Sequence, residues 1–449
     1  MSEINCNGSR ASVITLGCKV NQYESEAIAE RLTLFGFSLL PSNQTCDVYI
    51  INTCTVTAES DRKCRQLIRR AISANPEAYI IVCGCMAQVH ADAIAEIDGV
   101  DVILGNTDKL RCADIAAELV LSKVKANSPA ILTDDIDTAP FERMSITQFE
   151  RTRAYLKIED GCENRCTYCI IPSARGKVRS KPMTDVLDEV RTLVNGGCRE
   201  IVLTGIETGS YGRDTGEYDL ADLLCEVDKI EGDFRVRTGS LDPTVMKVGF
   251  VNRIKSLKKL APHFHLSLQS GSDRILALMK RKYNSEMALR NISYLKQQIP
   301  DVMLTTDIIT GFPGETEEDF LLSVEFAQKA RFLAMHVFPY SERKGTPAAS
   351  MANSVPVNIR HERCARLIEV GKKITAEILQ EFIREGKAVP VLFETYKNGY
   401  AYGHTPSFIE VAIKSDCPLR SQIATFIPEY TDGVICFGRV TDNFCKGEQ

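Results

Sequence analysis

The stretch that decides the fold reads Gly161-Cys162-Glu163-Asn164-Arg165-Cys166-Thr167-Tyr168-Cys169-Ile170-Ile171-Pro172, and it follows a short apolar run. Its three cysteines have the spacing C-x3-C-x2-C. Three thiolates on one loop can hold three irons of a [4Fe-4S] cube and leave the fourth iron open to a substrate or cofactor. A structural zinc site wants four ligands, and no second C-x2-C or histidine pair lies near in the sequence. The spacing therefore favours an iron–sulfur site over zinc, redox or simply buried cysteines.

This loop begins a long alternation of strands and helices. The apolar runs predict strands at 154–159, 201–204, 234–237, 263–268, 303–309 and 335–338. Helical patterns lie between them, for example at 185–195, 243–260, 285–298 and 317–329, and a long helix is expected at about 359–384. About six βα units predict a partial TIM-like barrel, in which chemistry is expected at the carboxyl ends of the strands.

The N-terminal part shows the same alternation on a smaller scale. Strands are predicted at 13–16, 48–52 and 79–82, and helices at 24–35, 61–74 and 91–97, which indicates a parallel α/β domain of the Rossmann or flavodoxin-like kind. Each strand is followed closely by a cysteine: Cys18, Cys54 or Cys85. Ligands collect at such strand ends, so the three thiols could converge. Spacing alone leaves a packing role open, and Cys46, Cys64 and Cys83 are rivals.

Two further segments complete the domain organisation. Residues 126–150 lack apolar periodicity, contain an acidic run, and are predicted to be a linker. The β-rich runs at 389–394, 408–413, 422–427 and 433–439, separated by Gly, Pro and Asn, predict a small OB-like β-barrel. The expected division is therefore 1–125, 126–150, 151–385 and 386–449.

Composition limits the class of protein. The chain has 449 residues, 44% of them hydrophobic, which is ordinary for a globular protein and excludes collagen-like and disordered classes. It lacks an apolar stretch of about 18 residues and an apolar N-terminal leader, so a cytoplasmic location without a membrane span is expected. In a reducing compartment its 17 cysteines favour metal ligands over disulfides. The net charge of −5 argues against a general nucleic-acid coat.

The sequence motifs around the cysteines resemble those of the radical methylthiotransferases, a branch of the radical S-adenosylmethionine superfamily. The resemblance covers nearly the whole chain, and the β-rich tail is similar to the TRAM domain that closes these enzymes. The matching stretches are Thr15-Leu16-Gly17-Cys18-Lys19-Val20-Asn21-Gln22-Tyr23-Glu24, Asn52-Thr53-Cys54-Thr55-Val56-Thr57, Gly84-Cys85-Met86-Ala87-Gln88, His265-Leu266-Ser267-Leu268-Gln269-Ser270-Gly271-Ser272, Asp307-Ile308-Ile309-Thr310-Gly311-Phe312-Pro313-Gly314-Glu315-Thr316 and His336-Val337-Phe338-Pro339-Tyr340-Ser341.

Three stretches are similar to the MtaB branch of this family: Lys19-Val20-Asn21-Gln22-Tyr23, Cys54-Thr55-Val56-Thr57 and Arg343-Lys344-Gly345-Thr346-Pro347. That branch methylthiolates C2 of N6-threonylcarbamoyladenosine next to the tRNA anticodon. The alternatives are methylthiolation of isopentenyladenosine in tRNA or of a ribosomal protein, whose branches usually read Gly-Cys-Gln-Met-Asn and Gly-Cys-Pro-Lys-Asn at the first cysteine. A further alternative is a non-catalytic iron–sulfur protein that binds RNA.

The resemblance implies the cofactors and their residues. Two [4Fe-4S] clusters are expected, one on Cys162, Cys166 and Cys169 and one on Cys18, Cys54 and Cys85, together with S-adenosyl-L-methionine. The resemblance places the latter against Tyr168, Thr204, Gly205, Gln269, Gly311 and Phe312. No catalytic residue beyond the cluster ligands is implied, and the other eleven cysteines have no implied role. The chain departs from the family pattern at Ser173, Glu207 and Thr208.

Partners follow from the same reasoning. A tRNA substrate, an external electron donor and an external sulfur source are expected, and a monomer is favoured. Arg62, Arg65 and Arg69 fall near one face of the helix after Cys54 and are candidates for phosphate contact, although such a face is as often merely solvated. A second candidate group follows the central cysteines and contains Arg175, Lys177, Arg179 and Lys181.

Overall fold

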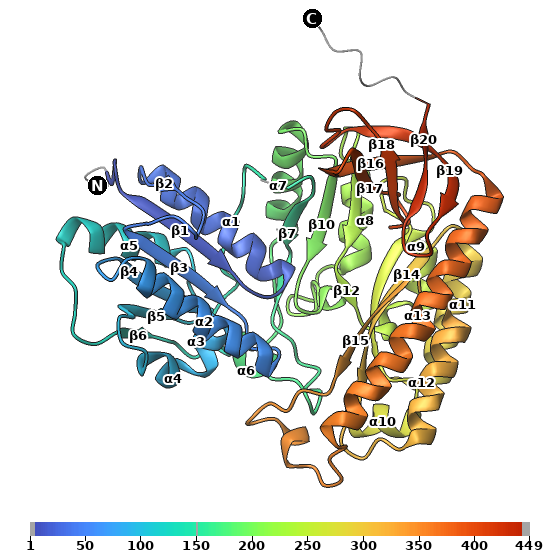
Figure 1. Ribbon diagram of the computed structural model, residues 1–449, viewed down its shortest axis with the longest axis horizontal. Coiled ribbons are helices and arrows are strands. Elements are labelled where there is room, and N and C mark those ends of the chain that lie inside the picture. The colour runs from blue at the N-terminus through green and yellow to red at the C-terminus, as the bar shows by residue number, and fades with distance from the viewer. Residues whose placement is uncertain (1–4, 150, 442–449) are drawn as a thin grey trace, which may run out of the picture.

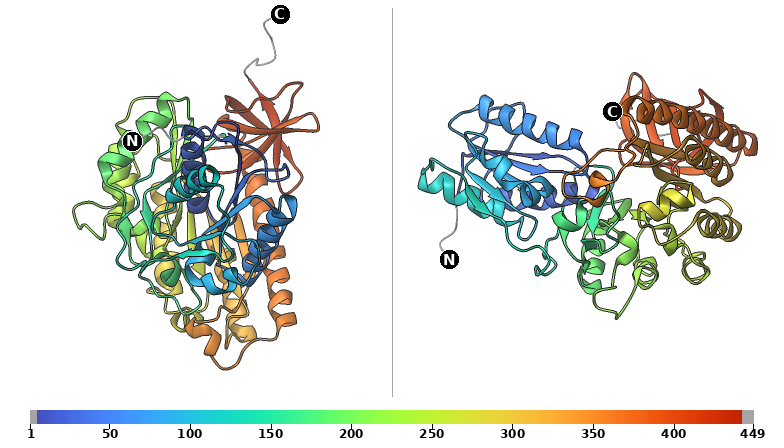
Figure 2. Two further views of the ribbon diagram at one scale, coloured as in Figure 1. Left: turned by 90° about the vertical axis from the view of Figure 1, so that its left-hand side faces the viewer. Right: turned by 90° about the horizontal axis from the view of Figure 1, so that it is seen from below.

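The computed structural model describes residues 5–149 and 151–441 of the chain. Three bodies follow one another along it: an N-terminal α/β domain, a central half-open barrel, and a small C-terminal β-barrel that sits on one end of the central body (Figure 1). The two further views show the N-terminal domain beside the open side of the central barrel (Figure 2). The N-terminal domain and the central domain, which carry the two groups of candidate cysteines, therefore share an interface.

The N-terminal domain is a doubly wound sheet. Its strands are all parallel and run in the order β2-β1-β3-β4-β5-β6. They are β1 (Arg10–Thr15), β2 (Ser38–Leu39), β3 (Val48–Thr53), β4 (Tyr79–Gly84), β5 (Val102–Leu104) and β6 (Ala130–Leu132). The chain reverses its direction of winding between β1 and β3, and such a switch point is where doubly wound sheets bind ligands.

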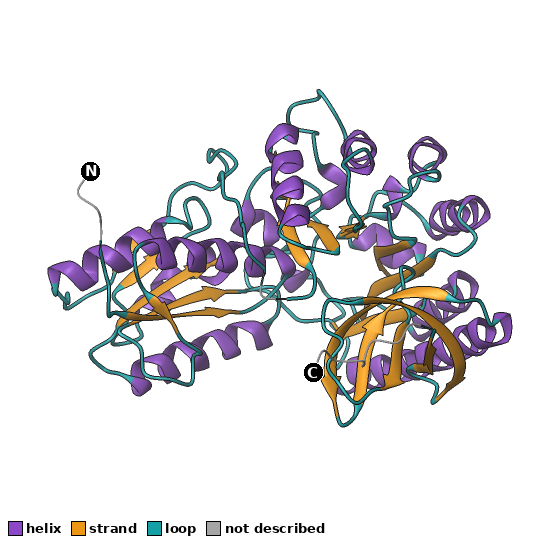
Figure 3. Ribbon diagram, turned by 90° about the horizontal axis from the view of Figure 1, so that it is seen from above, coloured by secondary structure: helices purple, strands orange, loops and turns teal. Residues whose placement is uncertain are grey.

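Helices cover both faces of this sheet, as the view from above shows (Figure 3). They are α1 (Lys19–Leu34), α2 (Ala58–Ala74), α3 (Cys85–Val89), α4 (Ala91–Ala95) and α5 (Arg111–Ser122). Ile28 and Ala116 pack on one face, from α1 and α5, while Ile68 and Ile94 pack on the other, from α2 and α4. Every residue of β3 is buried, as expected for a central parallel strand between two helical layers.

The described part of the expected linker 126–150, residues 126–149, differs from that expectation. They contain β6, which pairs with β5 and extends the sheet, and Met144 and Ile146 are buried in the core of the central domain. The three apolar residues of β6 are too few to produce a periodic pattern, so the sequence does not predict this strand. This segment therefore fastens the two domains together.

The central domain is a half-open barrel of parallel strands. It consists of the sheet β11-β10-β7 and the sheet β12-β13-β14-β15, which adjoin where Gly239 separates β11 from β12. The strands are β7 (Ala154–Lys157), β10 (Glu200–Thr204), β11 (Arg235–Thr238), β12 (Ser240–Leu241), β13 (His263–Gln269), β14 (Met303–Thr310) and β15 (Ala334–Pro339). Because β11 and β12 continue one another, the six predicted strands and the partial barrel are confirmed.

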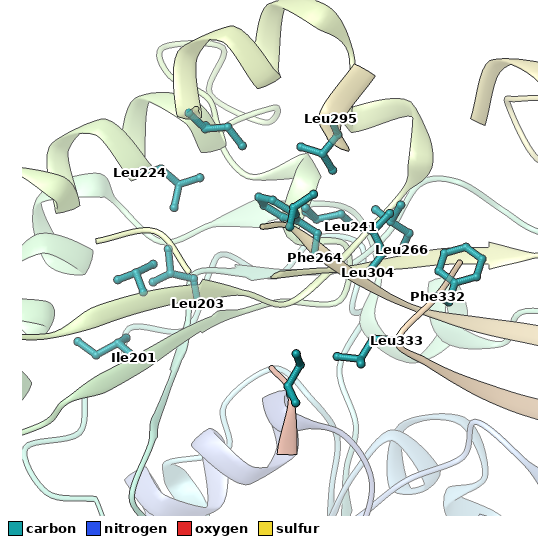
Figure 4. Packing of buried hydrophobic residues seen from close by; sticks show 14 of the residues in the cluster. Ile201, Leu203, Leu224, Leu241, Phe264, Leu266, Leu295, Leu304, Phe332 and Leu333 are labelled. Atoms are coloured by element: carbon teal, nitrogen blue, oxygen red, sulfur yellow. The ribbon is translucent and has the colours of Figure 1, made fainter. Parts of the chain in front are cut away.

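An outer ring of helices covers this barrel. Its members are α7 (Met183–Asn195), α8 (Leu220–Asp228), α9 (Val248–Ile254), α10 (Asp273–Leu278), α11 (Ser285–Gln298) and α12 (Glu317–Ala330). Strand residues such as Leu203, Phe264 and Leu304 pack outward against helix residues such as Leu224 and Leu295 (Figure 4). The opposite side of each strand faces the barrel interior and carries polar residues.

Shorter elements connect these parts: the antiparallel pair β8 (Glu159–Asp160) and β9 (Arg179–Ser180), the helix α6 (Ile171–Arg175), and the 3₁₀ turns η1 (Thr208–Ser210), η2 (Pro243–Val245) and η3 (Pro347–Ser350). The helix predicted at 243–260 is shorter, because the chain after Lys255 turns back and Leu260 bridges to Val236.

The long helix α13 (Val357–Glu385) leads to the closed C-terminal barrel, in the order β16-β17-β18-β20-β19. Its strands are β16 (Val389–Lys397), β17 (Tyr400–His404), β18 (Glu410–Lys414), β19 (Ile423–Thr431) and β20 (Cys436–Val440). The OB-like prediction is confirmed, except that it omitted β17. The missed signal is Asn398-Gly399, a hairpin turn with positive φ at both residues (53° and 78°). Cys445 lies outside the described residues.

Candidate functional site

The central cysteine loop lies at the carboxyl ends of the barrel strands, between β8 and α6. Two backbone hydrogen bonds hold this loop: the Cys162 amide donates to the Gly176 carbonyl (3.0 Å) and the Cys169 amide to the Cys166 carbonyl (3.0 Å). Gly161 opens the loop with φ +89°, and a Cβ there would stand 1.9 Å from the Lys177 carbonyl oxygen. Only glycine fits this turn.

The thiols of this loop form one electrostatic group. Burial is the main cause that raises the pKa of Cys162 and of Cys169 to about 12, and a neighbouring cysteine contributes to the rise at each. Nη1 of Arg281 donates to Cys166 Sγ (3.3 Å), and Asp242 holds the same guanidinium (2.7 Å). Thiols of this kind lose their protons when a metal binds, and an arginine donor stabilises the resulting sulfur charge. The donor set fits a cluster with three cysteine ligands.

The structure also brings Cys18, Cys54 and Cys85 together at the switch point of the N-terminal sheet. A Cβ on Gly17 would lie 2.7 Å from Cys54 Cβ, so the Cys18 and Cys54 loops are in contact. Burial, and to a smaller extent the neighbouring Cys85 and Cys18, raise the pKa of Cys54 to about 12. Cys18 caps α1 and Cys85 opens α3, where the positive helix ends favour thiolates.

The rival cysteines have structural roles instead. Cys64 lies on α2, where its Sγ donates to the Cys54 carbonyl (3.3 Å) and receives the Cys54 amide (3.4 Å), so it supports the Cys54 loop from behind. Cys46 and Cys83 are fully buried in the two apolar layers on either side of the sheet. The three cysteines that meet are therefore those at the strand ends, which spacing along the chain could not show.

Arg175 connects the two cysteine sites. It ends α6, directly after the central cysteine loop, and its side chain is fully buried. Nε donates to Cys85 Sγ (3.3 Å), Nη2 donates to Asn21 (2.5 Å), and Nη1 pairs with Asp160 (3.2 Å). Glu24 completes the group: burial raises its pKa, but Arg175 and two lysines hold it well below its usual range.

The prediction that Arg175 contacts RNA is therefore wrong, because its guanidinium is buried and bonded to groups of the protein. Arg179 and Lys181 are buried as well, with Lys181 paired to Glu189, whereas Lys177 is exposed. A basic run has the same sequence pattern whether its side chains face solvent or form buried ion pairs between domains. The buried carboxylates Glu24 and Asp160 are the missing partners that the sequence pattern did not reveal.

A second bridge, also missed in the sequence, reaches the Cys54 loop from the segment that follows β15. Arg343 Nη2 donates to Thr55 (2.7 Å) and pairs with Asp61 (2.6 Å), and it is almost fully buried. The Ala58 amide donates to Ser341 Oγ (3.1 Å). Two separate segments of the barrel domain thus support the N-terminal cysteine site.

The candidate residues for S-adenosylmethionine border the central loop. Tyr168 packs edge-on against Phe312 (6.5 Å between ring centroids), and Phe312 is fully buried. Thr204 ends β10 and Gly205 follows it, and a Cβ on Gly205 would stand 2.5 Å from Glu159 Oε2. Gln269 and Gly311 end β13 and follow β14, each with a positive φ (71° and 70°). The structure therefore places all six at or beside the carboxyl ends of the strands.

The buried polar atoms near these strand ends that lack a hydrogen-bond partner within the described residues include Glu159 Oε1, Thr208 Oγ1 and Thr238 Oγ1. They belong together, because a Cβ on Gly239 would stand 2.8 Å from Thr208 Oγ1 and Glu159 accepts the Glu207 amide (2.9 Å). Buried polar atoms normally have partners, so an absent group is expected here. Such acceptors fit the ammonium of a bound amino acid.

The arginine face on α2 remains accessible. Arg69 is exposed and Arg65 is partly exposed, while Arg62 is exposed and paired with Glu59 (2.6 Å). Pairs of this kind on a helix surface are weak and can exchange for a phosphate.

None of the described helices is both long and apolar enough to cross a membrane.

Comparison with known proteins agrees with this geometry. The Radical SAM superfamily model matches residues 156–327, and the model named Uncharacterized protein family UPF0004 matches residues 10–105. Among solved structures, the fold resembles the radical S-adenosylmethionine methyltransferase TsrM from Kitasatospora setae, with TM-score 0.56, 14% identity, and 76% and 77% of the two chains covered. The strand-end cysteine loop on a half-open barrel defines a radical S-adenosylmethionine enzyme.

Curated relatives narrow this class. The chain is 39% identical over 405 residues to threonylcarbamoyladenosine tRNA methylthiotransferase MtaB of Bacillus subtilis, covering 89% of both proteins. It is 39% identical to the MtaB of Thermotoga maritima, covering 85% of this chain and 86% of that one. The tRNA-2-methylthio-N(6)-dimethylallyladenosine synthase of Acetivibrio thermocellus is 37% identical, with 85% and 79% covered. The chain belongs to the MtaB branch of the radical methylthiotransferase family. Its cofactors are two [4Fe-4S] clusters and S-adenosyl-L-methionine.

Proposed function

We propose that this enzyme methylthiolates C2 of N6-threonylcarbamoyladenosine in tRNA, next to the anticodon, to give 2-methylthio-N6-threonylcarbamoyladenosine. The observation that carries the proposal is the meeting of two three-cysteine sites across one buried arginine, since Arg175 touches Cys85 and follows directly on the central cysteine loop. Methylthiolation needs two such sites, one to start a radical and one to deliver sulfur. The MtaB relatives of Bacillus subtilis and Thermotoga maritima align with 89% and 85% of this chain, which supports the proposal.

The bound cofactors supply a 5′-deoxyadenosyl radical, a methyl group and the sulfur that is transferred. The chain itself holds and orients them. In the proposal, Cys162, Cys166 and Cys169 ligate one cluster, and Cys18, Cys54 and Cys85 ligate the other. Each site leaves one iron without a protein ligand, because three thiolates cannot fill four positions.

The carboxylate and hydroxyls at the strand ends bind the methionine part of the cofactor. Glu159 is buried, and burial raises its pKa well above the usual range, so an ammonium beside it would restore the charged form. Thr208 and Thr238 offer unpartnered hydroxyls. Tyr168 stands on Phe312 and supplies a flat wall for the adenine. This wall and the barrel interior exclude water and hold the reacting carbon near the substrate.

The domains divide this work. We assign residues 1–125 to the sulfur-delivering cluster, 151–385 to radical generation and 386–449 to a TRAM-like barrel that contacts RNA, with 126–150 between the first two. Arg62, Arg65, Arg69 and Lys177 supply candidate phosphate contacts. The electron and sulfur donors are external proteins or small molecules, and the enzyme works as a monomer in the cytoplasm, where mature tRNA is available.

Nucleoside analysis tests this function. In cells that lack the gene, digested tRNA should lose the methylthio group from threonylcarbamoyladenosine, and the plasmid-borne gene should restore it. An unchanged nucleoside profile would contradict the proposal. Loss of the group from isopentenyladenosine, or a mass change in a ribosomal protein, would assign the chain to another branch. Iron without formation of 5′-deoxyadenosine would favour a non-catalytic RNA-binding protein.

A further inference from the structure

One inner wall of the central barrel carries a group of three side chains that none of the roles above uses. His265, Asp307 and His336 come from the neighbouring strands β13, β14 and β15, and Asp307 and His336 are paired in register. The next residues along two of these strands, Leu266 and Ile308, belong to the apolar core under the helices. Because side chains alternate along a strand, the group points to the other side of the sheet, into the barrel.

The three side chains are in direct contact. Asp307 Oδ1 lies 3.1 Å from His336 Nδ1, and Oδ2 lies 3.1 Å from His265 Nε2. The two imidazole rings are 5.7 Å apart between centroids. One nitrogen or oxygen atom from each side chain lies within 4.8 Å of the other two. Two imidazoles and a carboxylate gathered in this way form a donor set that suits a divalent transition metal.

His265 is also held from behind. Its Nδ1 lies 2.9 Å from Thr305 Oγ1, and the same hydroxyl lies 3.1 Å from His263 Nε2. His263 is buried and stacks on Phe408 of the C-terminal barrel, with 4.5 Å between ring centroids. A histidine that binds a metal usually has its second ring nitrogen bonded to such a partner, which fixes the ring and directs the other nitrogen at the ion.

Asp307 has no permanent counter-ion. Among residues 5–149 and 151–441, its ion pairs are with the two imidazoles, and no lysine or arginine pairs with it. By contrast, the buried Glu200 at the start of β10 pairs with three arginines, which are Arg153, Arg235 and Arg237. A proton on an imidazole can balance the charge of Asp307. A metal ion can do so in its place, because metal binding displaces protons from the ligands.

The group is accessible, and it is distinct from the sites described above. The exposed fraction of the side chain rises from 13% for His265 through 28% for Asp307 to 63% for His336, so an ion can enter from solvent. His265 and Asp307 precede Gln269 and Gly311 by four residues each. The group therefore lies deeper in the barrel than the residues proposed for S-adenosylmethionine, and none of its members adjoins a cluster cysteine in the sequence.

We propose that His265, Asp307 and His336 bind one divalent transition-metal ion in addition to the two iron–sulfur clusters. Zinc and iron(II) both suit two imidazoles and a carboxylate. Three protein ligands leave a position open, as in sites where the metal binds a water or a substrate oxygen, whereas structural zinc sites have four protein ligands. The open position faces the barrel interior. The inference holds whichever nucleoside the enzyme modifies.

The test uses zinc as the probe, because the clusters contain iron and a zinc signal then comes from the added ion alone. Anaerobically reconstituted enzyme is dialysed against zinc, and both metals are measured by mass spectrometry. Wild type should keep its iron and hold about one zinc per chain. X-ray absorption at the zinc edge should show nitrogen and oxygen ligands at about 2.0–2.2 Å and no sulfur at about 2.3 Å.

Three variants grade the expected effect on zinc affinity. Thr305→Val keeps the shape of the side chain and removes the outer partner of His265, which should weaken binding by about 10- to 100-fold. His336→Gln removes the most exposed ligand and should weaken binding by more than about 100-fold, because a ligand matters more than an outer partner. His361→Gln changes an exposed histidine on α13 and is the matched control, which should bind zinc as wild type does.

Three results would overturn the proposal. The first is equal zinc affinity in His336→Gln and wild type. The second is sulfur around the zinc, which would place the ion on cysteines. The third is a wild type that keeps its iron and holds no zinc, which would leave Asp307 and its two imidazoles as a hydrogen-bonded network alone.

Discussion

The two cysteine sites reach the same donor set by different routes. The central site takes its three thiols from one loop of eight residues, Cys162 to Cys169, while the N-terminal site takes one thiol from each of three strand ends. Yet each places an arginine nitrogen 3.3 Å from one sulfur: Arg281 at Cys166 and Arg175 at Cys85. The cysteines of the central site are close together in the sequence, so a short motif contains them all. The cysteines of the N-terminal site come together only when the sheet has folded.

The largest expected effect comes from breaking the central site. Cys162→Ala should abolish cleavage of S-adenosylmethionine and remove about half of the iron, because two thiolates hold a cube poorly and the cofactor loses its iron. Iron assay and chromatographic detection of 5′-deoxyadenosine measure both. Cleavage that persists in this variant would show that the radical starts elsewhere.

Breaking the dispersed site should separate the two functions. Cys54→Ala should also lose about half of the iron but keep cleavage of S-adenosylmethionine, while transfer of the methylthio group to tRNA stops. Cys64→Ala is the matched control: it lies behind the same loop without being a ligand, and should retain transfer. Full iron in Cys54→Ala would refute the second cluster.

The buried bridge between the sites should rank next. Arg175→Ala leaves Glu24 and Asp160 buried with fewer partners, which should lower the free energy of unfolding by about 3–5 kcal/mol. The iron of the N-terminal site should be lost before that of the central site. Arg175→Lys keeps the positive charge but loses the planar set of guanidinium donors. It should therefore restore much of the free energy of unfolding, while the electron paramagnetic resonance spectrum of the N-terminal cluster should still differ from that of wild type. Identical spectra for wild type and Arg175→Lys would contradict a role at the cluster.

The smallest effect is expected at the second bridge. Arg343→Ala removes a pair with Asp61 and a bond to Thr55, and should lower the free energy of unfolding by about 1–3 kcal/mol. Since this contact supports the Cys54 loop from the barrel side, 5′-deoxyadenosine should form at the normal rate while less of it is coupled to methylthio transfer. Equal coupling ratios in variant and wild type would show that the contact only stabilises the fold.

The same contrast explains what could be predicted from the sequence. The barrel strands and β1, β3 and β4 of the N-terminal sheet follow from their apolar runs, and the central site follows from its spacing, because both are local properties of the chain. The short strands β2 and β5 were not predicted. The trio Cys18, Cys54 and Cys85 needed the resemblance to a known family as well as its strand-end positions. β17 was missed although Asn398-Gly399 signalled its turn, and β6 is too short to be recognised.

Long-range contacts set the remaining limit. The basic run after the central cysteines suggested an RNA surface, but Arg175 meets Glu24 across 151 residues of sequence. Glu159 and Thr208 carry no motif of their own, and they stand out only because the fold buries them without partners.

Iron and sulfide stoichiometry of the anaerobically reconstituted enzyme tests the central claim most directly. Two separate sites predict about eight irons and about eight sulfides per chain in wild type, and about four of each when either trio is replaced by alanine. The sulfide count excludes sulfur bound for transfer. About four irons in wild type, all lost with Cys162, Cys166 and Cys169, would contradict the account.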